Sequence, residues 1–236
     1  MRVNGSIALV TGGNRGLGAQ LVRALLEAGA SKVYATARDP RTVKAEGAVP
    51  VRLDLTDHAS ILAAAEQAQD VTLLVNNAGI NDFTHIMDDD LDALRLEYET
   101  NVIGTLDVTR AFAPVLARNG GGAILNVLSV MSWASLPTES GYSASKSAQW
   151  SVTNSLRLAL AGQKTQVTAL HVGRMDTDMI AGKGIDDPAD PAGIAKAALD
   201  GIEKGQWEVV ADDFSRQIKA GLSLDIEDLY TRLGLA

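Results

Sequence analysis

A tyrosine and a lysine, Tyr142 and Lys146, lie four residues apart in a stretch with helical spacing. Residues four apart share one face of a helix, with Cβ atoms about 5–6 Å from one another. This spacing holds an ammonium group beside a phenol whose unperturbed pKa is about 10. A nearby positive charge favours the phenolate, so we expect the pKa of Tyr142 to be lowered, which suits a phenol that exchanges protons with a substrate near neutrality.

A glycine-rich segment, residues 11–18, follows a short apolar run and precedes a stretch with helical spacing. In such a strand-to-helix turn, glycines permit close backbone approach, and the N–H groups at the helix start favour a pyrophosphate. Its spacing, Gly-x-x-x-Gly-x-Gly, differs from the Gly-x-Gly-x-x-Gly of the standard dinucleotide motif. The segment by itself leaves a phosphate site and a purely structural turn both open.

Arg38 follows the second apolar run, at the place where the adenosine ribose of a dinucleotide would lie. An acidic residue there would suit a 2′-hydroxyl, whereas Arg38 together with Arg15 could bind a 2′-phosphate. The alternative is two solvated arginines, with Asp39 partly neutralising Arg38. We therefore favour NADP(H) over NAD(H) as the cofactor.

The composition limits the kind of protein. The 236 residues are 46% hydrophobic and 21% charged, as expected for a globular protein with a sizeable core. The net charge of −8 argues against a surface for nucleic acid or an anionic membrane. With no cysteine and three scattered histidines, we expect no disulfide and no metal site. The sequence shows neither a signal-peptide pattern nor an apolar run near the ~18 residues of a membrane span, which predicts a cytoplasmic protein.

Short apolar runs alternate with longer stretches of helical spacing. Predicted strands occupy residues 6–10, 32–37, 49–53, 71–75, 123–128, 166–171 and 208–210. Predicted helices occupy residues 17–28, 57–68, 91–117, 143–161 and 191–203. This alternation predicts a Rossmann-type doubly wound α/β fold, with a seven-stranded parallel sheet and helices on both faces. We expect one domain over residues 1–236, with a short loop at about 177–191 and a tail, 212–236, that the pattern does not place.

The chain resembles the short-chain dehydrogenase/reductase family from residue 6 to about residue 210, and in particular its NADP-preferring carbonyl reductases. The motifs that carry the resemblance occur in the family's order: Thr11–Gly18, Asp54, the run Asn76-Asn77-Ala78-Gly79, Asn101, Ser129 and Tyr142-x-x-x-Lys146. Each motif is weak or moderate alone, whereas their combination at these positions is highly specific.

The resemblance implies a role for each matching residue. The catalytic residues would be Asn101, Ser129, Tyr142 and Lys146, with Asn101 at a helix kink holding a water that relays protons to Lys146. The dinucleotide would be bound by Gly12, Asn14, Arg15, Gly16, Leu17, Gly18, Arg38, Asp54, Leu55, Asn77, Ala78, Gly79, Tyr142, Lys146, Gly173, Met175 and Thr177.

Three of these assignments leave alternatives open. Asp54 would accept from the adenine amino group, or it could cap the following helix. Ser132 competes with Ser129, although it fits the family's Ser–Tyr separation less well. The family commonly has Pro-Gly after the sixth strand, whereas this chain has Val172-Gly173. The turn that presents the nicotinamide is therefore expected to be less rigid.

The implied activity is hydride transfer between NADPH and a ketone or aldehyde, or the reverse from a secondary alcohol. Ser129 and Tyr142 would hydrogen-bond the carbonyl oxygen, and Tyr142 would transfer the proton. The substrate-pocket candidates are Met131, Trp133, Leu136 and Met179, although Met131 and Trp133 could equally pack against the domain. The short loop at about 177–191 predicts a relatively open, mainly apolar pocket for bulky or aromatic ketones. His171 is expected in the core rather than as a second base.

Two further questions stay open in the sequence. The alternative to an enzyme is a NADP-binding sensor or scaffold that uses the fold without chemistry. For assembly, the resemblance favours a homodimer, with a tetramer or a monomer as the other possibilities.

Overall fold

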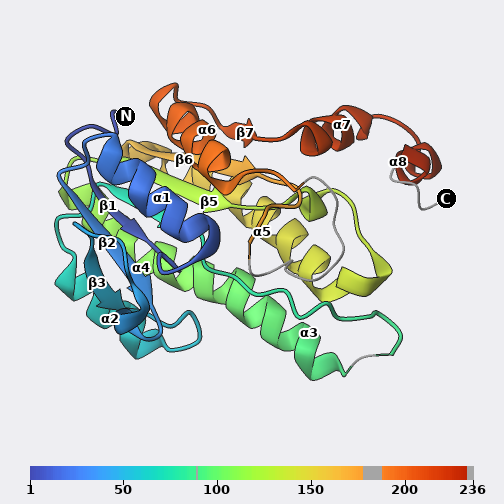
Figure 1. The fold of residues 1–236 in the computed structure, drawn as a ribbon, viewed down its shortest axis with the longest axis horizontal. Helices are drawn as coiled ribbons and strands as arrows, with labels where there is room; N and C mark the ends of the chain where they lie inside the picture. The colour runs from blue at the N-terminus through green and yellow to red at the C-terminus, as the bar shows by residue number, and fades with distance from the viewer. Residues whose placement is uncertain (89, 178–187, 233–236) are drawn as a thin grey trace.

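The sheet at the centre of the molecule has seven parallel strands. The computed structural model describes residues 1–88, 90–177 and 188–232. Within them the strands are β1 (Ile7–Val10), β2 (Lys32–Ala37), β3 (Val49–Arg52), β4 (Leu73–Asn76), β5 (Gly122–Val127), β6 (Thr165–His171) and β7 (Glu208–Val210). Their order across the sheet is β3-β2-β1-β4-β5-β6-β7 (Figure 1). The predicted Rossmann-type sheet is confirmed, and the strand order reverses direction between β1 and β4.

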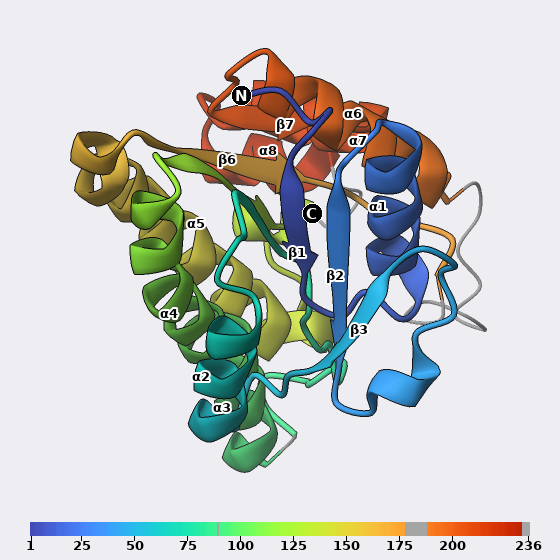
Figure 2. The ribbon, with the colours of Figure 1, turned by 90° about the vertical axis from the view of Figure 1, so that its left-hand side faces the viewer.

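Helices cover both faces of this sheet (Figure 2). One face carries α1 (Gly16–Glu27) and α6 (Pro191–Glu203), and the other carries α2 (His58–Gln67), α4 (Thr105–Arg118) and α5 (Ser140–Leu160). Strands buried on both faces need near-continuous apolar runs, and β4 is buried along its whole length. Apart from the helix predicted at residues 91–117, the predicted bounds of strands and helices differ from these by at most three residues.

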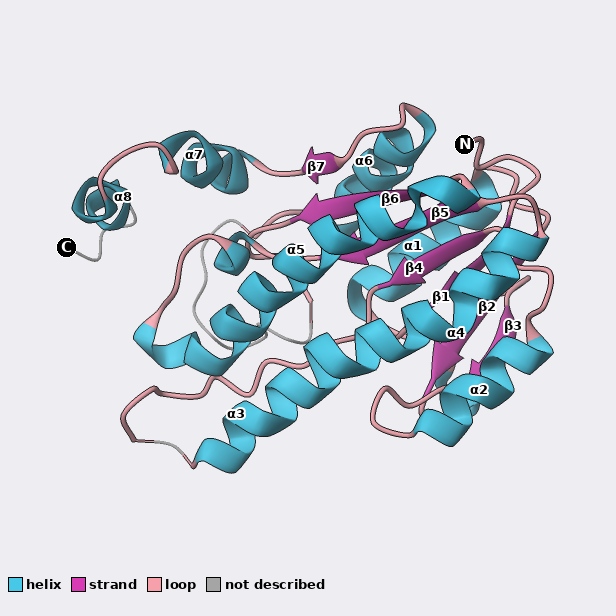
Figure 3. Cartoon of the chain, turned by 180° about the vertical axis from the view of Figure 1, so that it is seen from behind, coloured by secondary structure: helices cyan, strands magenta, loops and turns pink. Residues whose placement is uncertain are grey.

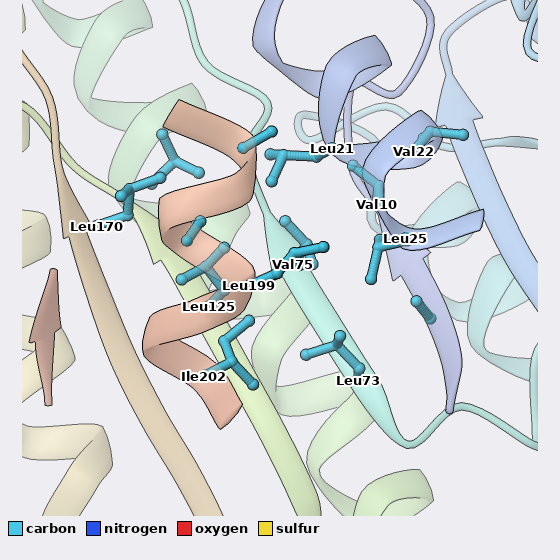
Figure 4. Close-up of a cluster of buried hydrophobic side chains, with 14 of the residues drawn as sticks. Val10, Leu21, Val22, Leu25, Leu73, Val75, Leu125, Leu170, Leu199 and Ile202 are labelled. Atoms are coloured by element: carbon cyan, nitrogen blue, oxygen red, sulfur yellow. The ribbon is translucent and has the colours of Figure 1, made fainter. Parts of the chain in front are cut away.

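Each face of the sheet has its own apolar layer. On the first face, Leu21 and Leu25 of α1 and Ile202 of α6 pack over β1, β4 and β5 (Figure 4). On the second face, Ile61 of α2 and Phe112 of α4 are fully buried. Burying a side chain of this size contributes roughly 1.5–3 kcal/mol, so these layers fix the sheet and the loops that leave its strands.

The stretch predicted as one helix at residues 91–117 consists of three segments. These are α3 (Leu91–Tyr98), a π-helical segment (Glu99–Gly104) and α4, which follow one another along the same face (Figure 3). The irregularity expected at Asn101 is therefore present as a π-helical segment, a form that is rare and often found at functional sites. A Cβ on Gly104 would lie 2.5 Å from the Leu55 carbonyl oxygen, so glycine permits this segment to approach the loop after β3.

The C-terminal tail forms two helices, α7 (Asp213–Gly221) and α8 (Ile226–Arg232), which follow β7 (Figure 1). Ile218 and Leu229 of these helices pack against Val130, Met131 and Ala134, which come directly after β5. Of the loop predicted at residues 177–191, residues 178–187 lie outside the described part of the chain. Among the described helices, none combines the length and the apolar character needed to cross a bilayer.

Candidate active site

A cleft of about 660 Å³ lies at the carboxyl ends of the strands. Its lining includes residues that directly follow six strands, among them Gly12, Arg38, Asp54, Ala78, Leu128 and Val172. In a doubly wound sheet, ligands bind at this edge, beside the point where the strand order reverses. The volume is in the usual range for a site that encloses a small molecule.

The glycine-rich turn between β1 and α1 forms the floor of the cleft. Gly12 and Gly16 have positive φ angles of 63° and 53°, which other residues rarely adopt. A Cβ on Gly18 would lie 2.0 Å from the Gly12 carbonyl oxygen, so no side chain fits at this position. Helix α1 begins at Gly16, and no described side chain caps its first turn. Its N–H groups and dipole are therefore left for an anionic ligand, and the turn fits the pyrophosphate of a dinucleotide.

A hydrogen-bond network ties this turn to the loop after β4. The Thr11 hydroxyl oxygen accepts from the N–H groups of Asn77 (2.9 Å) and Ala78 (3.0 Å). The Asn77 amide donates to the carbonyl oxygens of Thr11 (2.9 Å) and Gly12 (3.3 Å). The Asn77 side chain thus supports the turn from behind, while Asn77, Ala78 and Gly79 line the cleft. Sequence reasoning treated Thr11 only as part of the motif and missed this supporting role.

Arg38 lies exposed at the end of the cleft beyond β2. Asp39 binds Arg41 through both carboxylate oxygens, at 2.9 Å each, and the Arg41 guanidinium lowers the pKa of Asp39. The alternative in which Asp39 partly neutralises Arg38 gains no support from a direct contact, because Asp39 pairs with Arg41. Arg38 makes no ion pair with another described residue and remains available to an anionic group in the cleft.

Asp54 and Leu55 line the same end of the cleft. The Asp54 carboxylate accepts from the N–H (3.0 Å) and the hydroxyl (2.9 Å) of Thr56. The cap of α2 is Asp57, which accepts from the Ser60 N–H at 3.2 Å. The alternative in which Asp54 caps this helix is therefore wrong.

Asn14, Arg15 and Leu17 also line the cleft. The Asn14 amide donates to the Thr42 hydroxyl at 3.1 Å, which links the glycine-rich turn to the segment after β2. Thr42 lines the cleft as well and was not among the predicted residues, because nothing in the sequence pattern places it beside Asn14.

Of the four catalytic candidates, Tyr142 and Lys146 line the cleft, whereas Ser129 and Asn101 lie behind them. Tyr142 lies in the first turn of α5, because this helix begins three residues earlier than predicted. The Ser129 hydroxyl lies near enough to the Tyr142 phenol to lower its pKa, and its oxygen accepts from the Met131 N–H at 3.1 Å. Lys146 is 4% exposed, and its ammonium donates to the Val127 carbonyl oxygen at 3.0 Å and lies 5.5 Å from the centroid of the Tyr142 ring.

The ionisation of this pair differs from the expectation. Burial raises the pKa of Tyr142 to about 12, the Ser129 hydrogen bond lowers it by less, and the carboxylates of Glu139 and Glu97 raise it further. Burial also lowers the pKa of Lys146 to about 8. The predicted lowering of the tyrosine pKa is therefore wrong for the protein without a ligand. Burial penalises the charged form of both groups, and this effect exceeds their mutual attraction.

Asn101 is fully buried in the π-helical segment. Its side-chain oxygen accepts from the Ile80 N–H, and its amide donates to the Ile80 carbonyl and the Ser145 hydroxyl, each at 2.9 Å. A Cβ on Gly79 would lie 2.9 Å from the Asn101 oxygen and 3.8 Å from the Lys146 nitrogen. Asn101 therefore joins the loop after β4 to α5 beside Lys146, and the water relay stays a prediction.

Three substrate-pocket candidates pack near the C-terminal helices or on β6. Met131 is 7% exposed and packs with Ile218 and Leu229, and Leu136 borders the same cluster. Trp133 stacks on His171, with ring centroids 3.9 Å apart and planes 17° from parallel. None of the three is among the described residues that line the cleft, and the same holds for Ser129 and Asn101. The fourth candidate, Met179, lies outside the described residues.

His171 is fully buried at the end of β6, as expected. Burial lowers its pKa to about 4, and its Nδ1 lies 3.3 Å from the Ser129 carbonyl oxygen. Ser132 is also buried, and its hydroxyl oxygen accepts from the Ser129 N–H at 3.4 Å. Of the two serines, Ser129 is therefore the one that reaches Tyr142.

The segment after β6 closes the cleft. Val172, Met175 and Thr177 line it, and a Cβ on Gly16 would lie 3.6 Å from the Thr177 methyl group. The Val172 carbonyl accepts from the Val130 N–H at 2.8 Å, so this segment runs beside Ser129. Of the three cofactor-binding residues predicted in this segment, Met175 and Thr177 line the cleft, whereas Gly173 does not.

Comparison with known proteins agrees with this geometry. The family described as short chain dehydrogenase matches residues 6–187. A crystal structure of a short chain dehydrogenase from Burkholderia cenocepacia in complex with NADP superposes with a TM-score of 0.93 and 39% identity, covering 99% of each chain.

Two curated relatives show similar levels of identity. The 3-alpha-(or 20-beta)-hydroxysteroid dehydrogenase of Mycobacterium tuberculosis is 34% identical over 187 residues, 75% of this chain and 72% of the relative. The short chain dehydrogenase tazN of Aspergillus terreus is 34% identical over 200 residues, 77% of this chain. The match covers 44% of tazN, so the chain spans less than half the length of that relative.

The chain therefore belongs to the short-chain dehydrogenase family. It is an oxidoreductase that uses a pyridine nucleotide and acts on CH–OH or C=O groups.

Proposed function

We propose that this oxidoreductase is an NADPH-preferring carbonyl reductase, or secondary-alcohol dehydrogenase, for an apolar, ring-bearing substrate. The observation that carries the proposal is that Tyr142 and the buried Lys146 line the same cleft as Arg38, with Ser129 near the Tyr142 phenol. A sensor or scaffold would need only the dinucleotide cleft. It would not need the Ser129 and Tyr142 hydroxyls beside the buried amine of Lys146.

The chemistry of the chain's own residues follows from their ionisation. The pKa of about 12 keeps Tyr142 protonated at neutral pH, so its hydroxyl is a proton donor, as reduction requires. When bound, the reduced dinucleotide supplies the hydride to the carbonyl carbon. Ser129 and Tyr142 donate hydrogen bonds to the carbonyl oxygen, and these bonds strengthen as negative charge develops there.

Lys146 stabilises the phenolate that remains after Tyr142 gives up its proton. Its protonated form carries the positive charge beside the ring, and with a pKa of about 8 this form is the larger fraction at pH 7. The amine loses its proton as the pH rises above 8, so we expect the reductase activity to fall in alkaline solution.

The preference for NADPH rests on Arg38 and on one relative. Arg38 has no ion pair within the described chain and lies where a 2′-phosphate would be bound. The Burkholderia cenocepacia structure, which covers 99% of this chain, contains NADP. The proposal of a ring-bearing substrate is supported by the name of the Mycobacterium tuberculosis relative, a hydroxysteroid dehydrogenase. A steroid is a large apolar ring system.

The cofactor proposal is tested by Arg38→Asp. We expect this variant to bind NADPH at least about 10-fold more weakly and NADH with unchanged or improved affinity, because a carboxylate repels the phosphate and accepts from a ribose hydroxyl. Arg41→Ala is the matched control, since Arg41 is 89% exposed and its charge is paired with Asp39. If Arg38→Asp prefers NADPH over NADH as strongly as the wild type does, Arg38 does not determine cofactor choice.

The substrate proposal is tested by following NADPH oxidation with cyclic and aromatic ketones beside short-chain aldehydes and polar sugars. Higher kcat/KM for the ring-bearing ketones supports the proposal, and a preference for sugars contradicts it. Tight NADPH binding with no turnover of any carbonyl compound would favour the sensor.

A further inference from the structure

The C-terminal tail reaches the active-site end of the sheet through one carboxylate. Asp212 follows β7 and is partly buried. One of its oxygens accepts from the Gly173 N–H at 2.7 Å, in the segment that follows β6. A backbone N–H bonded to a carboxylate makes a charge-assisted hydrogen bond, which is about twice as strong as a neutral one.

The same carboxylate fixes the start of α7. It accepts from the N–H and the hydroxyl of Ser215, both at 2.8 Å, and so serves as the N-cap of this helix. Since a cap and a loop share one carboxylate, the position of α7 and the position of Gly173 are coupled.

Gly173 is shaped for this contact. A Cβ at this position would lie 2.9 Å from the Asp212 carboxylate and 3.3 Å from the Phe214 ring. The main-chain pairing of β6 with the tail extends to the Ala211 N–H, which donates to the His171 carbonyl at 3.0 Å. Asp212 supplies the acceptor for the N–H of Gly173, two residues further along the chain from His171.

The segment held in this way runs beside Ser129 and lines the cleft with Val172 and Met175. The Val172 carbonyl bonds the Val130 N–H, directly after Ser129, and Met175 lines the cleft just beyond Gly173. We propose that Asp212 is a positioning residue, which holds the segment 172–175 against the Ser129 side of the cleft and thereby orders the cofactor's nicotinamide end. The nicotinamide part of this inference rests on the proposed function.

Amide hydrogen exchange in the protein without cofactor tests the first half directly. In Asp212→Ala we expect the Gly173 amide to exchange at least about 10-fold faster than in the wild type, because its acceptor is gone. Asp212→Asn should exchange at a rate closer to the wild type, since an amide oxygen still accepts and asparagine still caps a helix. Asp213→Ala is the matched control, because Asp213 is exposed and its carboxylate pairs with Arg216 on the same helix.

Ligand binding tests the second half. Asp212→Ala should bind NADPH about 10-fold more weakly, while its affinity for 2′,5′-ADP, which lacks the nicotinamide, stays at the wild-type value. Equal weakening of both ligands would mean general destabilisation and would overturn the positioning role. Unchanged Gly173 exchange and NADPH affinity, equal to those of Asp213→Ala, would also overturn it.

If Asp212→Ala does not fold, Gly173→Ala serves in its place, because the added methyl displaces the carboxylate and should produce the same faster exchange at residue 173. A failure of the proposed function would be recognised separately. The wild type would then reduce no carbonyl compound, whereas the exchange rates would still decide whether Asp212 holds the segment.

Discussion

Replacement of Gly18 by alanine provides a quantitative test of the glycine-rich turn. The added methyl would lie 2.0 Å from the Gly12 carbonyl oxygen and 2.6 Å from the Asn77 amide nitrogen, against 3.4–4 Å for ordinary contact. The Gly12 carbonyl must move away, which costs ~1–3 kcal/mol as overpacking. The displaced carbonyl also loses its hydrogen bond from Asn77, which is worth ~1 kcal/mol.

The resulting loss of ~2–4 kcal/mol is divided between stability and cofactor binding. Thermal unfolding measures the first part, and titration of the protein with NADPH, followed by fluorescence, measures the second. If most of the loss falls on binding, the affinity decreases at least about 30-fold.

Gly162→Ala is the matched control, because Gly162 is exposed and nothing lies within 4 Å of an added methyl. This variant should change the unfolding free energy by less than ~1 kcal/mol and leave NADPH binding unchanged. If Gly18→Ala has wild-type stability and wild-type affinity, the close packing described for this turn is refuted.

Two further predictions concern the catalytic end of the cleft. Because the pKa of Lys146 is about 8 in the folded protein and 10.5 when unperturbed, the unfolded chain binds more protons between these values, and stability rises with pH. Measured by denaturant unfolding, the free energy of unfolding should rise between pH 8 and pH 10 by ~2 kcal/mol more in the wild type than in Lys146→Met. The same pH dependence in both proteins would contradict a buried amine at position 146. Asn101→Ala leaves the partly buried N–H and C=O of Ile80 without their Asn101 partners and should lower the unfolding free energy by ~1–3 kcal/mol. A loss below ~0.5 kcal/mol would show that these hydrogen bonds do not stabilise the fold.

The sequence predicted the sheet and the nucleotide end of the cleft well, for a physical reason. Buried parallel strands need apolar runs, and the glycines at 12, 16 and 18 are fixed by backbone angles and close approach, which depend on local sequence. The irregularity at Asn101 was predicted from the resemblance and from the poor helix propensity of asparagine, although its π-helical form was not.

The errors share a dependence on tertiary contacts. The pKa of Tyr142 was predicted from the spacing to Lys146 alone, whereas burial and the Val127 carbonyl decide where the amine points and which form is stable. The sequence left Trp133 between the pocket and the domain interior, and only the fold shows its stack on His171. The tail, whose pattern gave no placement, covers Met131 and supplies the contact to Gly173.

The turn after β6 shows how the two kinds of information combine. Val172 stands where the family commonly has proline, which predicted a less rigid turn. In the structure, hydrogen bonds from the Val130 N–H to Val172 and from Gly173 to Asp212 hold this turn from both sides. A proline ring would restrain this turn locally, whereas here the restraining hydrogen bonds come from residues distant in sequence. A local sequence pattern does not reveal such contacts.

The central claim is that Tyr142 transfers the proton in a hydride-transfer reaction. The most direct measurement is NADPH oxidation with a cyclic ketone by the wild type and by Tyr142→Phe, together with NADPH affinity for both proteins. We predict a loss of kcat of at least about 100-fold in Tyr142→Phe, with NADPH affinity within a few-fold of the wild type, because only the proton donor is removed. Equal kcat in the two proteins would contradict the account.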